Sequence, residues 1–315
     1  MREILGLPMD VSTHGPVIDN MIVIIHWLML VLFVGWGIYF LYTLFRFSKK
    51  RNPKANPEGV KNHFSTYVEI GVAVFEGILL IGLAIPVWSN VVTDFPSGKD
   101  AVTVRVIAEQ FAWNIHYPGP DGVFGKRDIH LVTAENPLGL DRTDADAKDD
   151  IATINVLHLP INKPVLILLS SKDVIHSFGI PLLRVKQDAI PGHNVPIKFI
   201  ATTTSADISK QLNMVYPIAP GHIPVQLTNL SAKAEYLDKE GNTILSVGET
   251  ITREAIDAAL AAGITEIMAG SDNPVEIACA QLCGLGHYRM RGAVTLETEE
   301  EFNAWLAEEA SYLDY

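Results

Sequence analysis

A short segment near the C-terminus concentrates side chains that bind soft metal ions. It reads Cys279-Ala-Gln-Leu-Cys283-Gly-Leu-Gly-His287-Tyr-Arg-Met290 and gathers two thiols, an imidazole and a thioether within twelve residues. Thiolate, imidazole and thioether ligands together favour copper over hard cations such as magnesium. Zinc would bind the thiolates and the imidazole but gains little from methionine. The residue types and their spacing therefore predict a copper site.

Two other interpretations remain open for Cys279 and Cys283, which are the only cysteines of the 315-residue chain. In an oxidising compartment they could form a structural disulfide, and as free thiols they could act as a redox pair. Neither gives a role to His287 and Met290, so the metal interpretation accounts for more of the segment. Two copper ions would need a further histidine, and the residue pattern alone does not select among His116, His130, His158, His176, His193 and His222.

Two apolar segments near the N-terminus are long enough to cross a membrane. From Met21 to Phe45, 25 consecutive residues include no Asp, Glu, Lys or Arg, and a bilayer core needs about 20 in a helix. We therefore expect membrane helices at 21–47 and 67–88. A secretory signal is the alternative for the first, but its apolar part would be shorter, and it would follow a basic cluster and end at small residues. The second carries Glu69 and Glu76, which share one helical stripe and should face a partner protein or a water path.

The loop between these helices, residues 48–66, belongs to a basic region. The single acid Glu58 stands there against six basic residues: Arg46, Lys49, Lys50, Arg51, Lys54 and Lys61. Short basic loops stay on the cytoplasmic side, so the N-terminal segment 1–20 and everything from Ser89 onward should lie outside. That exported part holds 17 basic and 30 acidic residues, a net charge of −13. Such acidity argues against nucleic acid as a partner.

The exported part alternates apolar and polar residues in short runs, which is typical of a β-sandwich or barrel. The runs begin at Val102 and continue at 151–157, 165–170, 195–204, 275–280 and 292–298. Residues 89–204 and 272–298 are therefore assigned to one β domain. Residues 205–271 contain a hairpin-like and a helix-like unit and are interpreted as an inserted subdomain. Residues 299–315 are interpreted as an acidic C-terminal tail.

Taken in order, these features resemble subunit II of haem-copper cytochrome c oxidases. The resemblance is carried by the two membrane helices, the exported β domain, Asp-Val-Ile-His-Ser-Phe at 173–178, Val-Lys-Gln-Asp-Ala-Ile-Pro-Gly at 185–192, and the Cys-x3-Cys-x3-His-x2-Met loop. It covers residues from about 17 to 204 and from 275 to 298. It implies a two-helix transmembrane hairpin followed by an all-β cupredoxin-like domain, a Greek-key sandwich, with an α+β insertion.

The resemblance also implies a dinuclear copper centre, CuA, in which two thiolates bridge the metals. The positions that match the family's motif are His176, Cys279, the backbone carbonyl of Gln281, Cys283, His287 and Met290. Asp188 would support the site from outside this ligand set. Two coppers that share two thiolates spread one electron over both metals, so bond lengths change little and electron transfer is fast.

Several positions bear on how far the resemblance extends. Gln281 stands where the family commonly has a Glu that helps to hold magnesium or manganese at the border with subunit I, so that ion is not implied here. Phe111 stands where a tryptophan usually accepts the electron, which leaves Phe111 or Trp113 as candidates for electron uptake. His193 replaces a usual Arg. Glu69 matches a glutamate near the cytoplasmic mouth of a proton path into subunit I.

The resemblance implies the electron-accepting subunit of a terminal oxidase. It would take single electrons from cytochrome c or an equivalent carrier and pass them to haem and copper in subunit I, where oxygen is reduced and protons are translocated. Subunit III and a quinol-oxidising complex are further partners that it allows. The implied location is an energy-transducing membrane, such as the bacterial plasma membrane, with the C-terminal domain outside. A membrane-tethered copper-delivery or thiol redox protein is the alternative, since it would need only Cys279 and Cys283.

Overall fold

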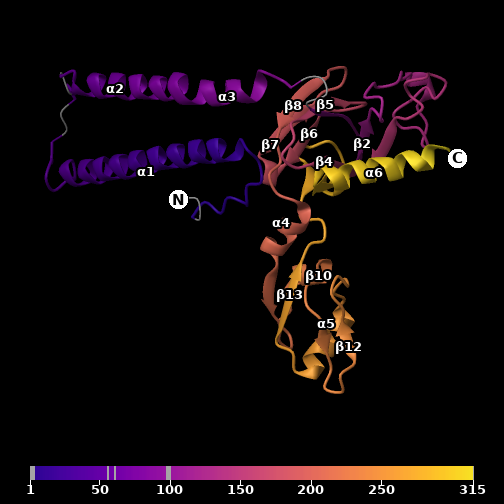
Figure 1. The fold of residues 1–315 in the computed structure, drawn as a ribbon. Helices are drawn as coiled ribbons and strands as arrows, with labels where there is room; N and C mark the ends of the chain where they lie inside the picture. The colour runs from indigo at the N-terminus through magenta and orange to yellow at the C-terminus, as the bar shows by residue number, and fades with distance from the viewer. Residues whose placement is uncertain (1–3, 55–56, 60–61, 97–100, 315) are drawn as a thin grey trace. The chain divides into compact units, whose positions relative to one another are not determined.

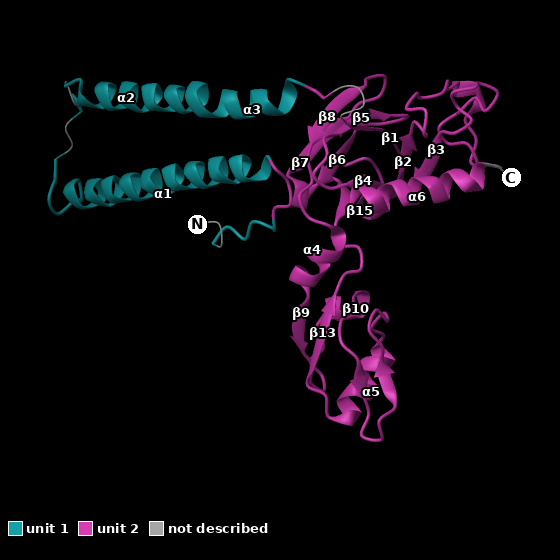
Figure 2. Cartoon of the chain, viewed as in Figure 1, with its two compact units in different colours: residues 1–9, 14–94 teal, residues 10–13, 95–315 magenta. Residues whose placement is uncertain are grey.

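The computed structural model describes residues 4–54, 57–59, 62–96 and 101–314. The chain divides into two compact units (Figures 1 and 2): residues 1–9 and 14–94 form unit 1, and residues 10–13 and 95–315 form unit 2. Lys61 of the basic loop and residues 97–100 lie outside the described residues. Two apolar helices in unit 1 and a β-rich unit 2 confirm the fold class that the sequence predicts.

Unit 1 consists of two long helical segments. They are α1 (Gly15–Arg46) and a second segment that runs from α2 (Phe64–Leu79) through a π-helical turn (Leu80–Ala84) into α3 (Ile85–Val92). Helix α1 begins earlier than residue 21 because Pro16 fits the first turn of a helix, where its missing N–H is not needed. The π-helical turn comes just before Pro86, whose missing N–H cannot bond to a carbonyl one turn back.

The side chains of both helical segments are apolar but not buried. In each segment, no residue of the most apolar 18-residue window is buried inside the protein. A core helix of a soluble protein would be mostly buried. Exposed apolar surface of this extent is typical of a site that contacts lipid or another protein. Both segments are long and apolar enough to cross a bilayer. Glu69 and Glu76 are both exposed on α2.

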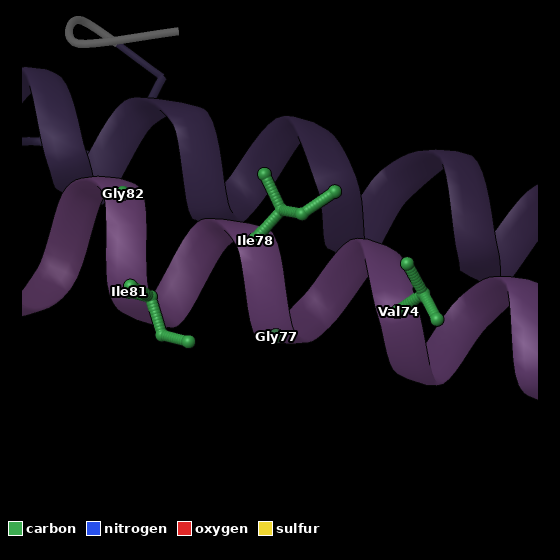
Figure 3. A pocket seen from close by; sticks show the side chains of 5 residues that line it. All are labelled: Val74, Gly77, Ile78, Ile81 and Gly82. Atoms are coloured by element: carbon green, nitrogen blue, oxygen red, sulfur yellow. The ribbon is translucent and has the colours of Figure 1, made fainter.

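The second segment also carries a shallow apolar groove. The groove is lined by Val74, Gly77, Ile78, Ile81 and Gly82 (Figure 3). It forms because the two glycines have no side chain to fill the space between the branched side chains. At about 100° per residue, the groove begins on a different side of the helix from the stripe of Glu69 and Glu76. The segment therefore presents two chemically different faces.

Unit 2 contains two five-stranded sheets. Their strand orders are β3-β2-β1-β5-β8 and β4-β15-β14-β6-β7. The strands are β1 (Val102–Glu109), β2 (Ala112–Tyr117), β3 (Ile151–Ile154), β4 (Val156–Pro160), β5 (Val165–Ser171), β6 (His176–Ile180), β7 (Val185–Ala189), β8 (Val195–Phe199), β14 (Glu276–Cys279) and β15 (Arg291–Glu297). Trp113 of β2 contacts Phe178 of β6 with ring centroids 5.5 Å apart. Both rings are fully buried, so the hydrophobic core lies between the two sheets.

The apolar run at 151–157, expected as one strand, is divided at Asn155. Here φ is +60°, a left-handed conformation that Asn tolerates better than most residues. The Asn155 side chain accepts a hydrogen bond from the Trp113 backbone N–H at 2.8 Å, which stabilises the bend. As a result β3 joins one sheet and β4 joins the other. Short 3₁₀ helices occur elsewhere, at Ile129–Leu131, Pro181–Leu183, Val225–Asn229, His287–Arg289 and Tyr312–Asp314.

Residues 205–271 fold around a small core of their own. Its fully buried members include Leu227, Ile256 and Ile267. Helix α5 begins after Thr252, whose hydroxyl accepts a hydrogen bond from the Ala255 N–H at 3.2 Å. The elements are α4 (Ser205–Leu212), β9 (Met214–Pro217), β10 (Ser231–Ala232), β11 (Tyr236–Leu237), β12 (Thr243–Leu245), α5 (Arg253–Ala262) and β13 (Glu266–Gly270).

The C-terminal segment is a packed helix rather than a solvated tail. Helix α6 (Glu299–Ser311) begins with a capping box between Thr298 and Glu301. Phe302 is buried, and Trp305 stacks on His158 of β4 with ring centroids 4.1 Å apart. The acidic residues that dominate the composition of this segment hide the aromatic residues that anchor it.

Residues 10–13, just before α1, form hydrogen bonds within unit 2. The N–H of Val11 donates to the carbonyl of Leu182 at 2.9 Å, and the N–H of Thr202 donates to the carbonyl of Val11 at 2.9 Å. Val11 is 1% exposed. Residues before and after the two apolar helices therefore belong to one folded unit.

A buried histidine makes the stability of unit 2 depend on pH. His116 and Asp150 are both fully buried, and the His116 Nε2 lies 2.7 Å from the Asp150 carboxylate. Burial lowers the pKa of His116 below its ordinary 6.5, against the opposing effect of Asp150 and aided by the positive charges of Arg105 and Arg127. The unfolded chain therefore binds a proton below about pH 6.5 that the folded chain resists.

We expect the free energy of unfolding to fall as the pH drops below about 6.5, by at most about 1.4 kcal/mol per pH unit for this one proton. Replacing His116→Gln keeps a hydrogen-bond donor for Asp150 but removes the titration. Urea unfolding of the full chain in detergent, followed by tryptophan fluorescence from about pH 5 to 8, should show a shallower pH slope for the variant. An unchanged slope would assign the dependence to other groups.

Candidate metal centre

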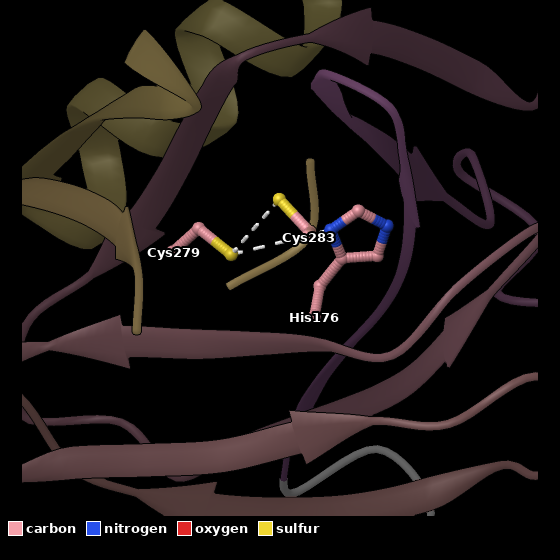
Figure 4. A group of neighbouring side chains, drawn as sticks. All are labelled: His176, Cys279 and Cys283. Carbon is pink, nitrogen blue, oxygen red and sulfur yellow. Dashed lines mark hydrogen bonds between the residues drawn. The ribbon is translucent and has the colours of Figure 1, made fainter. Parts of the chain in front are cut away.

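The two cysteines lie at the end of β14 and in the loop after it, with their sulfur atoms close together (Figure 4). The Sγ atoms of Cys279 and Cys283 are 3.8 Å apart, whereas a disulfide needs about 2.05 Å, so both thiols are free. Burial, together with the neighbouring Cys279, raises the pKa of the Cys283 thiol to about 11. A metal ion that binds here must displace a proton from this thiol.

His176 reaches the thiols from β6, 103 positions before Cys279. Strand β6 pairs with β14, and Phe178 lies opposite Cys279. The pairing brings the buried imidazole of His176 to the thiols, with Nδ1 4.0 Å from the Cys279 Sγ (Figure 4). The ligand atoms of His176, Cys279 and Cys283 all lie within 4.8 Å of one another. In the described part of the chain, this is the one group of three or more His, Cys, Asp or Glu side chains so arranged.

The loop from Cys279 to Met290 folds back and adds three donors. The Cys283 Sγ lies 3.6 Å from the His287 Nδ1 and 3.8 Å from the Met290 Sδ. The carbonyl oxygen of Gln281 lies 3.2 Å from the Cys279 Sγ. A backbone hydrogen bond from the Cys279 N–H to the Met290 carbonyl, 3.2 Å long, closes the loop. All six ligand positions named from the sequence therefore meet in one place.

Asp173 supports His176, a role that neither its sequence context nor the resemblance predicts. Its Oδ1 lies 2.8 Å from the His176 Nε2. Burial opposes ionisation of Asp173, but hydrogen bonds from His176, Gln110 and Val174 together lower its pKa. When the Nε2 proton of His176 is held by a carboxylate, Nδ1 keeps its lone pair free to bind a metal. An Asp three residues before the histidine was the available signal.

Asp188, the residue to which the resemblance assigns this support, lies elsewhere. It is exposed on β7 opposite Ser177, and within the described residues no hydrogen bond links it to any of the six ligand positions. Side chains alternate between the two faces of a strand. The residue of β7 that lies opposite His176 is Ala189, one position further on.

The donor set fits a metal ion of the soft type. Two ligands of one tetrahedral ion lie roughly 3.4–3.8 Å apart when metal–sulfur bonds are about 2.3 Å and metal–nitrogen bonds about 2.0 Å. The distances from the Cys283 Sγ to Cys279, His287 and Met290 are 3.8, 3.6 and 3.8 Å. Two thiols, two imidazoles, a thioether and a carbonyl exceed the needs of one four-coordinate ion and suit copper best.

The two candidates for electron uptake occupy different environments. Trp113 is fully buried, and its ring lies 6.2 Å from the His176 ring in an edge-on arrangement. Phe111 is half-buried and covers two glycines of the loop, because a Cβ added to Gly284 would lie 3.1 Å from the Phe111 ring. Of the two, only Phe111 therefore reaches both the surface and the loop. His193 is exposed, next to β7.

Several known proteins are similar to this chain. Residues 102–213 match the family described as cytochrome c oxidase subunit II, periplasmic domain. The alternative cytochrome c oxidase subunit 2 of Bradyrhizobium diazoefficiens is 29% identical over 305 residues, which cover 96% of this chain and 83% of the relative. Cytochrome c oxidase subunit 2 of Cereibacter sphaeroides is 26% identical over 255 residues, covering 74% and 80% of the two chains.

A crystal structure of the periplasmic domain of subunit II of cytochrome oxidase from Bradyrhizobium japonicum is 18% identical, with a TM-score of 0.35, and covers 70% of this chain and 99% of that domain. The long match to the alternative subunit 2 extends through the apolar helices, the sandwich and the loop that carries the candidate ligands. The resemblance expected from the motifs is thereby confirmed: over nearly its whole length, this chain is similar to cytochrome c oxidase subunit 2 proteins.

Proposed function

We propose that the site holds the dinuclear copper centre CuA and that the protein is the electron-accepting subunit of a terminal oxidase. The observation that carries this proposal is the position of His176 beside both thiols, within 4.8 Å. A protein that uses only two thiols would not require a buried histidine from another strand, a second histidine or a methionine. The similarity to cytochrome c oxidase subunit 2 proteins supports the same role.

A dinuclear copper group held by these residues would supply one-electron transfer. The chain's own residues keep the ligands in place between oxidation states. Cys279 is held at the end of β14, His176 is fixed by the adjacent β6, and Asp173 sets the orientation of the imidazole. A magnesium or manganese ion near this loop is not part of the proposal, since Gln281 offers no carboxylate.

The electron donor is proposed to be cytochrome c or another one-electron carrier outside the membrane. Phe111 is the candidate for the point of uptake because it is partly exposed and packs against the copper loop. Trp113 is too deeply buried to touch a carrier, but it contacts His176 and can lie on the path within the domain. The electrons would continue to haem and copper centres in subunit I.

We propose two membrane crossings with unit 2 on the outer face, in a bacterial plasma membrane. The basic residues 46–54 favour a cytoplasmic loop, and the pairing of Val11 with unit 2 supports outer positions for both ends. Subunit I, and with it a subunit III, would cover the exposed apolar helices. Glu69, near the cytoplasmic start of α2, is the candidate for the mouth of a proton path.

The test is reconstitution of the full chain, purified in detergent, with copper. We expect two coppers per chain, a purple colour and a mixed-valence electron paramagnetic resonance signal shared by two copper nuclei. The variant Met290→Leu should keep the fold and shift the midpoint potential and the spectrum, because the thioether is a ligand of the centre. One labile Cu(I) per chain would instead indicate copper delivery, and no copper with rapid disulfide formation would indicate a thiol redox protein.

A further inference from the structure

The turn between β1 and β2 connects the two halves of the candidate copper site. Gln110 makes two hydrogen bonds in different directions from this turn. Its backbone N–H donates to the Asp173 Oδ2 at 2.7 Å, and its side-chain Nε2 donates to the carbonyl oxygen of Cys283 at 2.6 Å. Residues 63 and 173 positions away in the sequence are thus linked through one residue.

The link continues to a ligand of the metal. The Oδ1 of Asp173 accepts from the His176 Nε2 at 2.8 Å while Oδ2 of the same carboxylate accepts from Gln110. A continuous series of hydrogen bonds therefore runs from the peptide of Cys283 through Gln110 and Asp173 to His176. The series ends at the backbone carbonyl of Cys283 in the loop and at the imidazole of His176 on β6, and both of these residues belong to the ligand set.

The next residue, Gly284, packs closely against the Gln110 side chain. A Cβ added to Gly284 would lie 2.8 Å from the Gln110 Nε2, closer than real Cβ atoms approach other groups. Gly284 also has φ of +133°, a conformation that side chains disfavour. With any other residue at position 284, the amide end of the Gln110 side chain would have to move from its present position.

The amide side chain is not needed to hold the turn itself. Glu109 pairs with Lys172 at 2.5 Å, and the Lys172 N–H donates to the Ala108 carbonyl at 2.9 Å. The hydrogen bond to Asp173 comes from the Gln110 backbone and survives any non-proline substitution. Changing the Gln110 side chain should therefore cut only the contact with Cys283.

We propose that Gln110 is a positioning residue that sets the location of Cys283 relative to His176. The inference rests on the proposed CuA centre and extends it to a residue outside the ligand set. Groups that orient metal ligands typically change metal affinity or activity by about 10- to 100-fold when removed. Gln110 is exposed, so we expect removal of its side-chain amide to change metal affinity by an amount at the lower end of this range.

The test compares two variants that differ in hydrogen bonding but not in length. Gln110→Met removes the donor at similar volume, and Gln110→Glu places a carboxylate against the Cys283 carbonyl. Gln211→Met, an exposed substitution on α4, is the matched control. All are made in the full chain, purified in detergent and loaded with copper, and the thermal unfolding of each copper-free protein is measured first.

We expect Gln110→Met to lose copper to a chelator roughly ten-fold faster than wild type, with a shifted midpoint potential and copper hyperfine pattern. Gln110→Glu should change more than Gln110→Met, since repulsion is added to the lost donor. A role in packing alone predicts the opposite order, because Glu has the shape of Gln. The control should match wild type in every measurement.

A readout without copper separates this inference from the proposed function. Hydrogen exchange is measured on the copper-free chains. At the amides of residues 283–287, exchange should be faster in Gln110→Met than in Gln211→Met. If wild type failed to bind two coppers, the CuA proposal would be overturned. The link between Gln110 and Cys283 would still stand if hydrogen exchange were faster in Gln110→Met than in Gln211→Met. Wild-type copper binding with no difference between Gln110→Met and Gln211→Met, in retention and exchange, would overturn the inference.

Discussion

Replacing Cys283→Ser is expected to reduce the copper content of the chain from two per molecule to one or none. The Sγ of this residue lies within 3.8 Å of Cys279, His287 and Met290, which makes it the centre of the donor set. A serine hydroxyl is a hard donor and does not ionise near neutral pH, so it cannot bridge two soft ions. Copper analysis and the loss of the shared two-copper resonance signal measure the effect.

Two carboxylate variants accompany this experiment, one as a control and one as a test of the support for His176. Asp188→Asn should load two coppers as wild type does, because Asp188 is exposed on β7 and opposite Ser177 rather than His176. Asp173→Asn should bind two coppers more weakly, because the hydrogen bond that fixes His176 is weakened. If Cys283→Ser retained both coppers and their shared signal, the assignment of the bridging thiols would be wrong.

The chemistry of the loop could be predicted from the sequence because it lies in consecutive residues. Two thiols, an imidazole and a thioether between Cys279 and Met290 limit the choice of metal before any fold is known. His176 is different, since nothing in its own surroundings distinguishes it from the other candidate histidines. It was selected through the resemblance to a family, and its geometry depends on the pairing of β6 with β14.

The support of the site could not be predicted, because it depends on which side chains share a face. Asp173 and Asp188 both lie within the motifs that carry the resemblance, and the sequence does not say which of them lies beside His176. The structure places Asp173 at 2.8 Å from the imidazole. The sequence offers even less indication of the role of Gln110, because its two partners are distant in the chain. Its backbone N–H bonds to Asp173, and its side chain bonds to the carbonyl of Cys283.

The fold shows the same limits on a larger scale. Apolar alternation located the strands, but a period of two cannot show that Asn155 redirects the chain from one sheet to the other. Composition described the C-terminal segment as acidic, although α6 is held by Phe302 and Trp305. Both differences come from single residues whose conformation or contacts outweigh the average character of their segments.

The largest rate effect is expected for the reaction with a basic carrier. The part of the chain from Ser89 onward has a net charge of −13, and a field of one sign can raise the rate of association with an oppositely charged protein by 10- to 1,000-fold at low ionic strength. Reduction of the intact oxidase by a basic cytochrome should slow by about a hundred-fold as salt is raised, since the screening length falls from about 30 Å at 0.01 M to about 3 Å at 1 M. Stopped-flow absorbance measures this rate.

An uncharged small reductant is the control for that experiment, because it is not steered by the field and should show nearly constant rates. A carrier with net negative charge should show the opposite trend, with faster reduction at high salt as repulsion is screened. If the basic carrier reacted at a rate independent of salt, the acidity of the exported part would have no role in docking. Electron uptake would then depend on short-range contacts alone, such as those available around Phe111.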